Sequence, residues 1–170
     1  PPYAPTEDFH TTQAESLANR HIPNSFETGK IYMVEYPMGT GGEKPQARDA
    51  LMSAFNQGSL IINWIGHGSA GLWADEHIFR RIEDIPRLRN GKKLPLIFTA
   101  SCSIGAFDAP AFESMAEEFA RTNGRGAIAV ISATRAVYGG PNGQLNNEVF
   151  DQLLYSDSVG IGAAVYIAKF

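Results

Sequence analysis

The sequence has a single cysteine, Cys102, and this scarcity excludes both an intrachain disulfide and a zinc site built from several thiolates. Three roles stay open for the residue: a buried small hydrophobe, a free thiol or a nucleophile. The four histidines form no His-x-x-x-His pair, and no carboxylates cluster with the spacing of metal ligands. We therefore expect no metal site and no cofactor.

Long hydrophobic runs and an excess of basic charge are missing too. No apolar stretch approaches the ~20 residues that a membrane-spanning helix needs, so we expect no membrane span in this chain. The net charge is -4, and the Lys and Arg residues are scattered apart from doublets such as Arg80-Arg81, which argues against a nucleic-acid partner. We interpret such doublets as part of a solvated face.

The composition that remains is that of a globular protein. With 170 residues, 44% hydrophobic and 19% charged, the chain suits one domain with a substantial core. It starts at Pro1 with neither Met nor a signal peptide, and it stops inside an apolar helical pattern. We therefore interpret residues 1–170 as a single domain excised from a longer precursor.

Hydrophobic periodicity predicts alternating helices and strands. Three predicted strands are apolar throughout, and such strands need cover on both faces, which crossover helices provide in a parallel sheet. The fold class predicted is therefore α/β, a three-layer sandwich with a mainly parallel sheet. The predicted strands are 30–36, 60–65, 94–100 and 126–133, and the predicted helices are 10–20, 47–55, 82–88, 112–119, 145–154 and 161–168.

Two of these strands end in a reactive side chain, His67 after the strand at 60–65 and Cys102 after the strand at 94–100. Reactive groups in parallel sheets cluster at the carboxyl ends of strands, and neighbouring strands lie about 4.8 Å apart. If the two strands are neighbours, the pattern favours Cys102 as a nucleophile and His67 as its acid and base. Backbone N–H groups of Gly68 and Cys102 are the candidates for an oxyanion hole, and glycine on both sides of His67 leaves room for substrate.

Other interpretations of these residues are open. Taken alone, Cys102 fits a buried core thiol and His67 fits a histidine held by backbone at a turn, but two such residues at matching strand ends would be a double coincidence. Residues 66–71 match the G-x-G-x-x-G dinucleotide pattern, yet no helix begins within the motif and the next strand does not end in an acidic residue. A serine hydrolase is disfavoured because Ser101 and Ser103 do not lie in a G-x-S-x-G elbow.

The same segments resemble the gingipain family of cysteine peptidases (the C25 type), which share a caspase-like α/β fold. The likeness lies in Asn-Trp-Ile-Gly-His-Gly-Ser at 63–69 and in Leu-Pro-Leu-Ile-Phe-Thr-Ala-Ser-Cys-Ser-Ile-Gly-Ala-Phe-Asp at 94–108, and it covers most of residues 30–155. Within the family, the chain resembles the sortase-like peptidase of the type IX secretion system more than it resembles the secreted virulence proteases. The resemblance implies a single caspase-like peptidase domain with His67 as the catalytic histidine and Cys102 as the nucleophile.

The resemblance also implies a biological setting. It implies a secreted bacterial protein, or one attached to the outer-membrane surface, that cleaves a protein or peptide substrate through a Cys thioester acyl-enzyme. In the sortase-like branch the reaction removes a C-terminal sorting signal and can transfer the acyl group to a cell-surface acceptor amine. In some members an acidic residue upstream orients the histidine, and Asp8 is the candidate here. The alternative is that Asp8 caps a helix that begins before Thr11.

Two further alternatives remain. One is a secreted gingipain-like protease that hydrolyses its acyl-enzyme with water, and the other is a non-catalytic caspase-like domain that binds partners on a surface protein. The residue that sets side-chain preference is not identified: Asp75 or Asp108 would make a pocket acidic, but each also suits a role in stabilising a loop.

Overall fold

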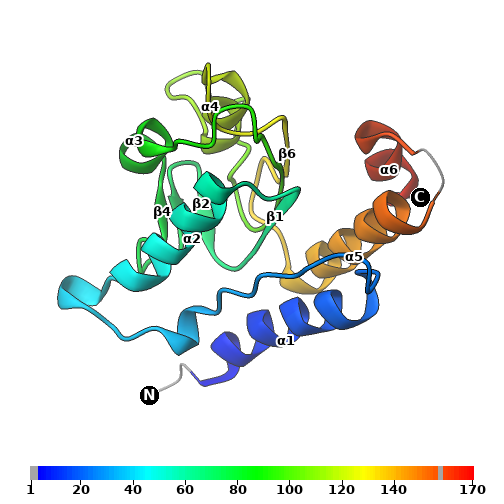
Figure 1. Ribbon diagram of the computed structural model, residues 1–170, viewed down its shortest axis with the longest axis horizontal. Coiled ribbons are helices and arrows are strands. Elements are labelled where there is room, and N and C mark those ends of the chain that lie inside the picture. The colour runs from blue at the N-terminus through cyan, green and yellow to red at the C-terminus, as the bar shows by residue number, and fades with distance from the viewer. Residues whose placement is uncertain (1–3, 157–158) are drawn as a thin grey trace. The chain divides into compact units, whose positions relative to one another are not determined.

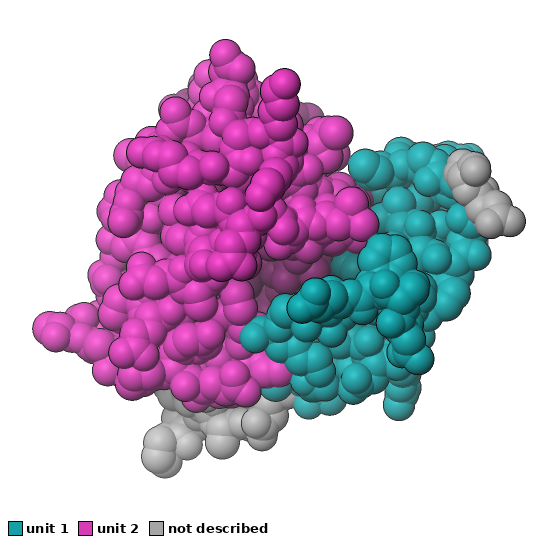
Figure 2. Space-filling view, in the orientation of Figure 1, with its two compact units in different colours: residues 1–30, 138–170 teal, residues 31–137 magenta. Residues whose placement is uncertain are grey.

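The computed structural model describes residues 4–156 and 159–170, with side chains from residue 9 onward. The chain divides into two compact units (Figure 2), one formed by Pro1–Lys30 with Tyr138–Phe170 and the other by Ile31–Val137. That residues 1–170 act as a single peptidase domain stays a prediction.

The larger unit is built on a parallel sheet (Figure 1) of β1 (Ile61–Ile65), β5 (Leu96–Ala100) and β6 (Ala129–Ser132), in the order β1-β5-β6. Every residue of the central strand β5 is buried. This confirms for β5 the expectation of a strand covered on both faces, whereas β1 and β6 are mostly half-buried. The strands are one to three residues shorter at their ends than the sequence predicts.

Helices α2 (Pro45–Gln57) and α4 (Met115–Arg121) supply much of the core on one side of this sheet. Helix α2 begins with proline, whose missing N–H costs nothing in the first turn, and Gly58 ends it at a φ of 96°. Helix α4 begins with a capping box in which the Ser114 side chain and the Glu117 carboxylate each bond the other's backbone N–H. Four rings pack with centroids 5.2 to 6.1 Å apart: Phe55 of α2, Phe119 of α4, and Trp73 and Phe79 from the segment between β1 and β5.

A second, antiparallel sheet follows β1 directly and was not predicted. It consists of β2 (Gly68–Ser69), β3 (Leu72–Trp73) and β4 (Phe79–Arg80), in that order. Strands of two residues are too short to show an alternating pattern, so periodicity could not reveal them. The chain continues into α3 (Arg81–Asp84) and a 3₁₀ turn (Ile85–Arg87), which together match the helix predicted at 82–88.

Two predictions in this unit are wrong. The segment 30–36 is not a strand: Met33–Glu35 form a 3₁₀ turn, in which the N–H of Tyr36 donates to Met33 O at 3.1 Å. Its apolar side chains Ile31, Met33 and Tyr36 pack against the core without pairing to a strand, so their spacing reflects burial and not a ladder. The helix predicted from Phe112 begins only at Met115, because Ser114 caps it, and Phe112 is half exposed.

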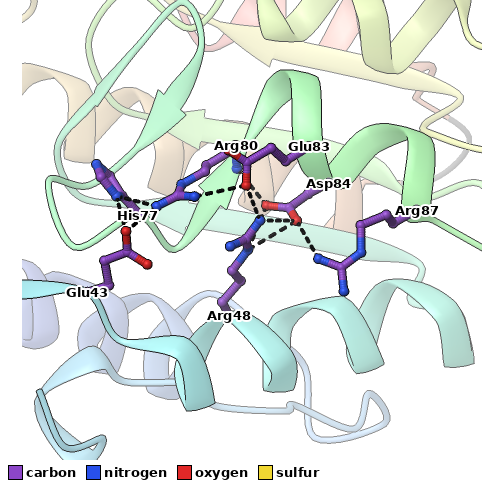
Figure 3. A network of polar contacts seen from close by, with 7 residues as sticks. All are labelled: Glu43, Arg48, His77, Arg80, Glu83, Asp84 and Arg87. Atoms are coloured by element: carbon purple, nitrogen blue, oxygen red, sulfur yellow. Dashed lines mark hydrogen bonds and ion pairs between the residues drawn. The ribbon is translucent and has the colours of Figure 1, made fainter. Parts of the chain in front are cut away.

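A charged network joins α2 to the segment around α3 (Figure 3). The fully buried carboxylate of Asp84 accepts hydrogen bonds from Arg48 Nε at 3.0 Å and Nη2 at 2.6 Å, and from the Arg80 N–H at 2.8 Å. Burial alone would lower the pKa of the Arg48 guanidinium, but its hydrogen bonds to Asp84 and Glu83 and the charges of these carboxylates outweigh that effect and raise the pKa. The doublet Arg80-Arg81 is therefore not a solvated face: these side chains are only 22% and 19% exposed, and both are paired with carboxylates.

The smaller unit contains the helices α1 (Ala4–Arg20), α5 (Gly139–Tyr155) and α6 (Ile161–Ile167). All three were predicted, although α1 and α5 begin about six residues earlier than expected. Helices α1 and α5 are linked by a hydrogen bond from Gln13 Nε2 to Gly139 O at 3.0 Å. Immediately after α1 ends, His21 contacts α5 through its Nδ1, which lies 2.8 Å from the Asp151 carboxylate.

In the part of the chain that the structure describes, no helix combines the length and the apolar character needed to cross a membrane.

Candidate active site

The ends of β1 and β5 lie side by side and in register. Ile65 pairs with Ala100 as the last rung of the parallel ladder, and the condition that the sequence left open, that the two strands are neighbours, is met. His67 and Cys102 each lie two residues beyond that rung. Their backbones therefore leave the sheet at the same edge, from strands about 4.8 Å apart.

Gly68 brings the chain after His67 back against the residues that flank Cys102. A Cβ atom on Gly68 would lie 2.5 Å from Ser101 Oγ and 2.7 Å from Ile104 Cδ1, both far inside van der Waals contact. Gly66 is enclosed in the same way, with its Cβ position 2.8 Å from the Trp64 ring. Gly68 thus allows the histidine segment to pack against the cysteine segment, and Gly66 makes room for the Trp64 ring.

The backbone of His67 is held firmly while the residue itself is exposed. Its carbonyl accepts hydrogen bonds from Trp64 Nε1 and from the N–H of Ala74, each at 3.1 Å. The Trp64 ring in turn stacks on Trp73 with a centroid distance of 5.3 Å. Two bonds to one carbonyl restrict the peptide plane, so the position of the imidazole depends on few remaining torsions.

The thiol of Cys102 contacts the backbone of Val137. Its Sγ lies 3.5 Å from the Val137 nitrogen, whose N–H donates to it, and 3.7 Å from the Val137 oxygen. The residue is half-buried, unlike the fully buried side chains of the core.

The turn after Cys102 is strained and tied to the loop that follows β6. Ser103 has a φ of 54°, in the left-handed region that residues other than glycine rarely adopt. Its N–H donates to Arg135 O at 3.1 Å, and the N–H of Gly105 donates to Ala133 O at 3.0 Å. These bonds continue the contact between the β5 and β6 segments past the sheet and hold Cys102 at the turn.

A pocket opens beside these segments, and sequence reasoning anticipated only part of its lining. Asp108, one of the two acids considered for a pocket, does line it, whereas Asp75 is exposed elsewhere. Arg135 donates to both carboxylate oxygens of Asp108, and these hydrogen bonds lower the pKa of the Asp108 carboxyl. The two arginines of the pocket were missed for different reasons: Arg81 was assigned with Arg80 to a solvated face, and Arg135 is an isolated basic residue that carries no periodic signal.

The remaining predicted residues stay predictions. Gly68 lies in β2 opposite Trp73, and nothing tests its N–H or that of Cys102 as an oxyanion hole. Asp8 lies in α1, but its side chain falls outside the described residues. Among the described residues, no group of three or more His, Cys, Asp or Glu side chains could hold a metal ion.

A parallel α/β sheet whose adjoining strand ends lead to a histidine and a cysteine fits the class of protein that the resemblance implied, a cysteine peptidase of caspase-like α/β fold. The chain matches the family model of peptidase family C25 over residues 3–170, and it belongs to that family. It is 32% identical over 88 residues to gingipain R2 and gingipain R1 of Porphyromonas gingivalis, which is 49% of this chain but 12% and 9% of those two relatives.

Solved structures agree with this assignment of the fold. The Arg-specific cysteine proteinase gingipain R is 28% identical, with a TM-score of 0.59 over 64% of this chain and 25% of its own. A complex of the pro- and mature domains of RgpB from P. gingivalis gives a TM-score of 0.62 at 26% identity, over 69% of this chain and 29% of its own. The predicted caspase-like fold and the predicted family are thereby confirmed, and the chain spans less than a third of each of these relatives.

Proposed function

We propose that the protein is a cysteine endopeptidase in which Cys102 is the nucleophile and His67 the general base and acid. The observation that carries this proposal is the register of the parallel ladder, because the last rung, Ile65 with Ala100, is equally distant from both residues. Membership of peptidase family C25 supports it independently. The half-buried thiol against the Val137 backbone supports it as well, since a core thiol would lie within the strand.

The reaction follows from these positions. His67 takes the proton from Sγ, and the thiolate attacks the carbonyl carbon of the scissile bond. The N–H groups of Gly68 and Cys102 stabilise the oxyanion of the tetrahedral intermediate. His67 then gives the proton to the leaving amine, which breaks the C–N bond and leaves a thioester on Cys102. Either water or an acceptor amine attacks this thioester and restores the thiol, and Asp8 is proposed to orient His67.

The proposed substrates are C-terminal sorting signals of proteins exported by a type IX secretion system, at the outer surface of a bacterium. In this proposal a cell-surface amine can replace water as the acceptor, so that cleavage and attachment are one reaction. The similarity of residues 63–69 and 94–108 to the sortase-like branch supports this choice of substrate.

The experiment that tests the pair is labelling of the thiol by iodoacetamide between pH 5 and pH 9, followed by mass spectrometry. A thiol of ordinary acidity, with a pKa of about 8.5, reacts at pH 6 roughly 300 times more slowly than its thiolate. We expect fast labelling of Cys102 at pH 6 that is lost in His67→Ala. The matched control is His21→Ala, which removes a histidine of the smaller unit and leaves the strand ends intact.

Two outcomes bear on the proposal. If His67→Ala labels with the wild-type pH profile, His67 does not act on Cys102 and the binding-domain alternative is favoured. If the pair is active, peptide products formed with and without added hydroxylamine separate the two acceptors, since hydroxamate marks transfer of the acyl group to an amine.

A further inference from the structure

A pocket of about 570 Å³ lies beside the proposed catalytic pair, and the mechanism above does not use it. Ser69 lines it two residues after His67, and Ser103 lines it immediately after Cys102. Consecutive Cα atoms are 3.8 Å apart, so the pocket begins within one residue of the proposed nucleophile. Cys102 itself does not line the pocket, but a peptide whose carbonyl carbon reaches Sγ has the pocket within reach of a neighbouring side chain.

Apolar residues, three alanines and Phe112 among them, make up much of the lining, and hydrogen-bond donors are set among them. The lining residues carry three hydroxyl groups and two guanidinium groups, and Asp108 is the carboxylate among the described lining residues. Both oxygens of that carboxylate already accept from Arg135, one of them at 2.6 Å, which also lowers the pKa of Asp108. The donors are the side chains of Ser69, Arg81, Ser103, Thr134 and Arg135.

The walls that carry these donors are held by hydrogen bonds. Ala70 O accepts from the N–H of Met115 at 2.7 Å, and Gly71 O accepts from the N–H of Arg81 at 2.9 Å. The Arg81 side chain is fixed by Glu118 at 2.7 Å. Arg135 differs, because its side chain is 67% exposed, and an exposed ion pair adds little net stability. Its guanidinium can therefore turn from Asp108 toward a ligand at small cost.

We propose that this pocket binds an acidic side chain, Asp or Glu, that flanks the scissile bond of the substrate. A carboxylate finds three hydroxyl groups and the exposed guanidinium of Arg135, which can turn toward it, while Arg81 stays paired with Glu118 and adds positive charge at the wall. A basic side chain finds Asp108, whose two oxygens both accept from Arg135. The inference rests on the proposed function, since it takes Cys102 as the point at which the peptide is cleaved.

The test is binding of fluorescent peptides to the Cys102→Ala protein, which holds substrate without turning it over. The peptides carry Glu, Gln or Lys at successive positions of one polyalanine frame. When the variable residue stands at one or two adjacent positions of the frame, we expect the Glu peptide to bind about tenfold more tightly than the Gln peptide. A hydrogen bond to a charged group contributes about this much affinity. Arg135→Gln should remove that preference, Arg135→Lys should restore part of it, and Asp108→Asn should strengthen it by freeing Arg135.

The matched control is Arg121→Gln, which breaks a similar exposed arginine–carboxylate pair, with Glu113, outside the pocket. Equal or tighter binding of Lys peptides, or equal effects of Arg135→Gln and Arg121→Gln, would overturn the proposal. Cleavage by the wild-type protein separates the two ideas. Cleavage without any preference for Glu refutes the pocket alone, whereas Glu-dependent binding without cleavage refutes the peptidase and leaves the pocket standing.

Discussion

Gly68 offers the most direct perturbation of the candidate site, because a methyl group there would enter the contact between the two proposed catalytic segments. In Gly68→Ala the new Cβ would lie 2.5 Å from Ser101 Oγ and 2.7 Å from Ile104 Cδ1. Ile104 is fully buried and Ser101 nearly so, which leaves neither side chain room to withdraw. The segments that carry His67 and Cys102, beyond the ends of β1 and β5, would have to move apart.

The structure sets the size of this effect. Overpacking of a filled interior by a methylene costs about 1–3 kcal/mol of unfolding free energy, and two clashing neighbours favour the upper half of that range. The matched control is Gly71→Ala, which adds the same methyl in the same hairpin where no atom lies within 4 Å. An exposed substitution of this kind shifts the unfolding free energy by about 0.5 kcal/mol or less.

Urea unfolding of both variants measures the difference, and iodoacetamide labelling at pH 6 reports on the pair. A displacement of about 1 Å between reacting groups can cost on the order of 100-fold in rate, so we expect Gly68→Ala to slow labelling and Gly71→Ala to leave it unchanged. The double variant Gly68→Ala/Ser101→Ala should recover part of the lost stability, since it removes one of the two clashes. Equal stabilities of Gly68→Ala and Gly71→Ala would refute the packing argument.

Three other predictions concern the charges and caps. Arg48→Ala leaves the buried Asp84 carboxylate without its main partner and should lower the free energy of unfolding in urea by about 3–5 kcal/mol. The control is Arg87→Ala, because the Arg87 side chain is 64% exposed and lies 3.5 Å from Asp84; its loss should cost under about 1 kcal/mol. Ser114→Ala breaks the capping box of α4 and should cost about 1 kcal/mol, with Ser53→Ala, on the exposed face of α2, as the control. Because Arg135 lowers the pKa of Asp108 below its ordinary value of 3.8, the pair stabilises the fold at neutral pH and loses its effect as the pH falls through that lowered pKa. NMR titration should therefore show the pKa of Asp108 rise in Arg135→Gln, and an unchanged midpoint would contradict the ion pair.

The parallel sheet could be predicted from the sequence because the burial of its strands leaves a clear apolar pattern in the sequence. Ile97 and Phe98 lie in a largely apolar run that is buried at every position, and such a run has few alternatives to a covered strand. The segment 30–36 shows the limit of the same reasoning. Its apolar residues are buried against the core, but a strand also needs a partner, and the pairing of a strand is decided by the rest of the fold.

Long-range charge pairing was beyond prediction for a related reason. Arg81 and Glu118 are 37 residues apart, and nothing in the spacing of either residue signals the 2.7 Å contact between them. Arginine is exposed in most settings, so a doublet is assigned to the surface by default. Only the tertiary structure shows that Arg80 and Arg81 both turn inward to carboxylates.

The position of Cys102 argues more strongly for a reactive thiol than its sequence context could. Burial along β5 continues through Ser101, which is 2% exposed, and then ends at Cys102, so the thiol lies at the first residue past the closed core. Ser103 then holds a left-handed conformation that glycine would adopt without strain, a cost that folds retain mainly at functional turns. A thiol that served only to fill the core would need neither the exposure nor the strained turn.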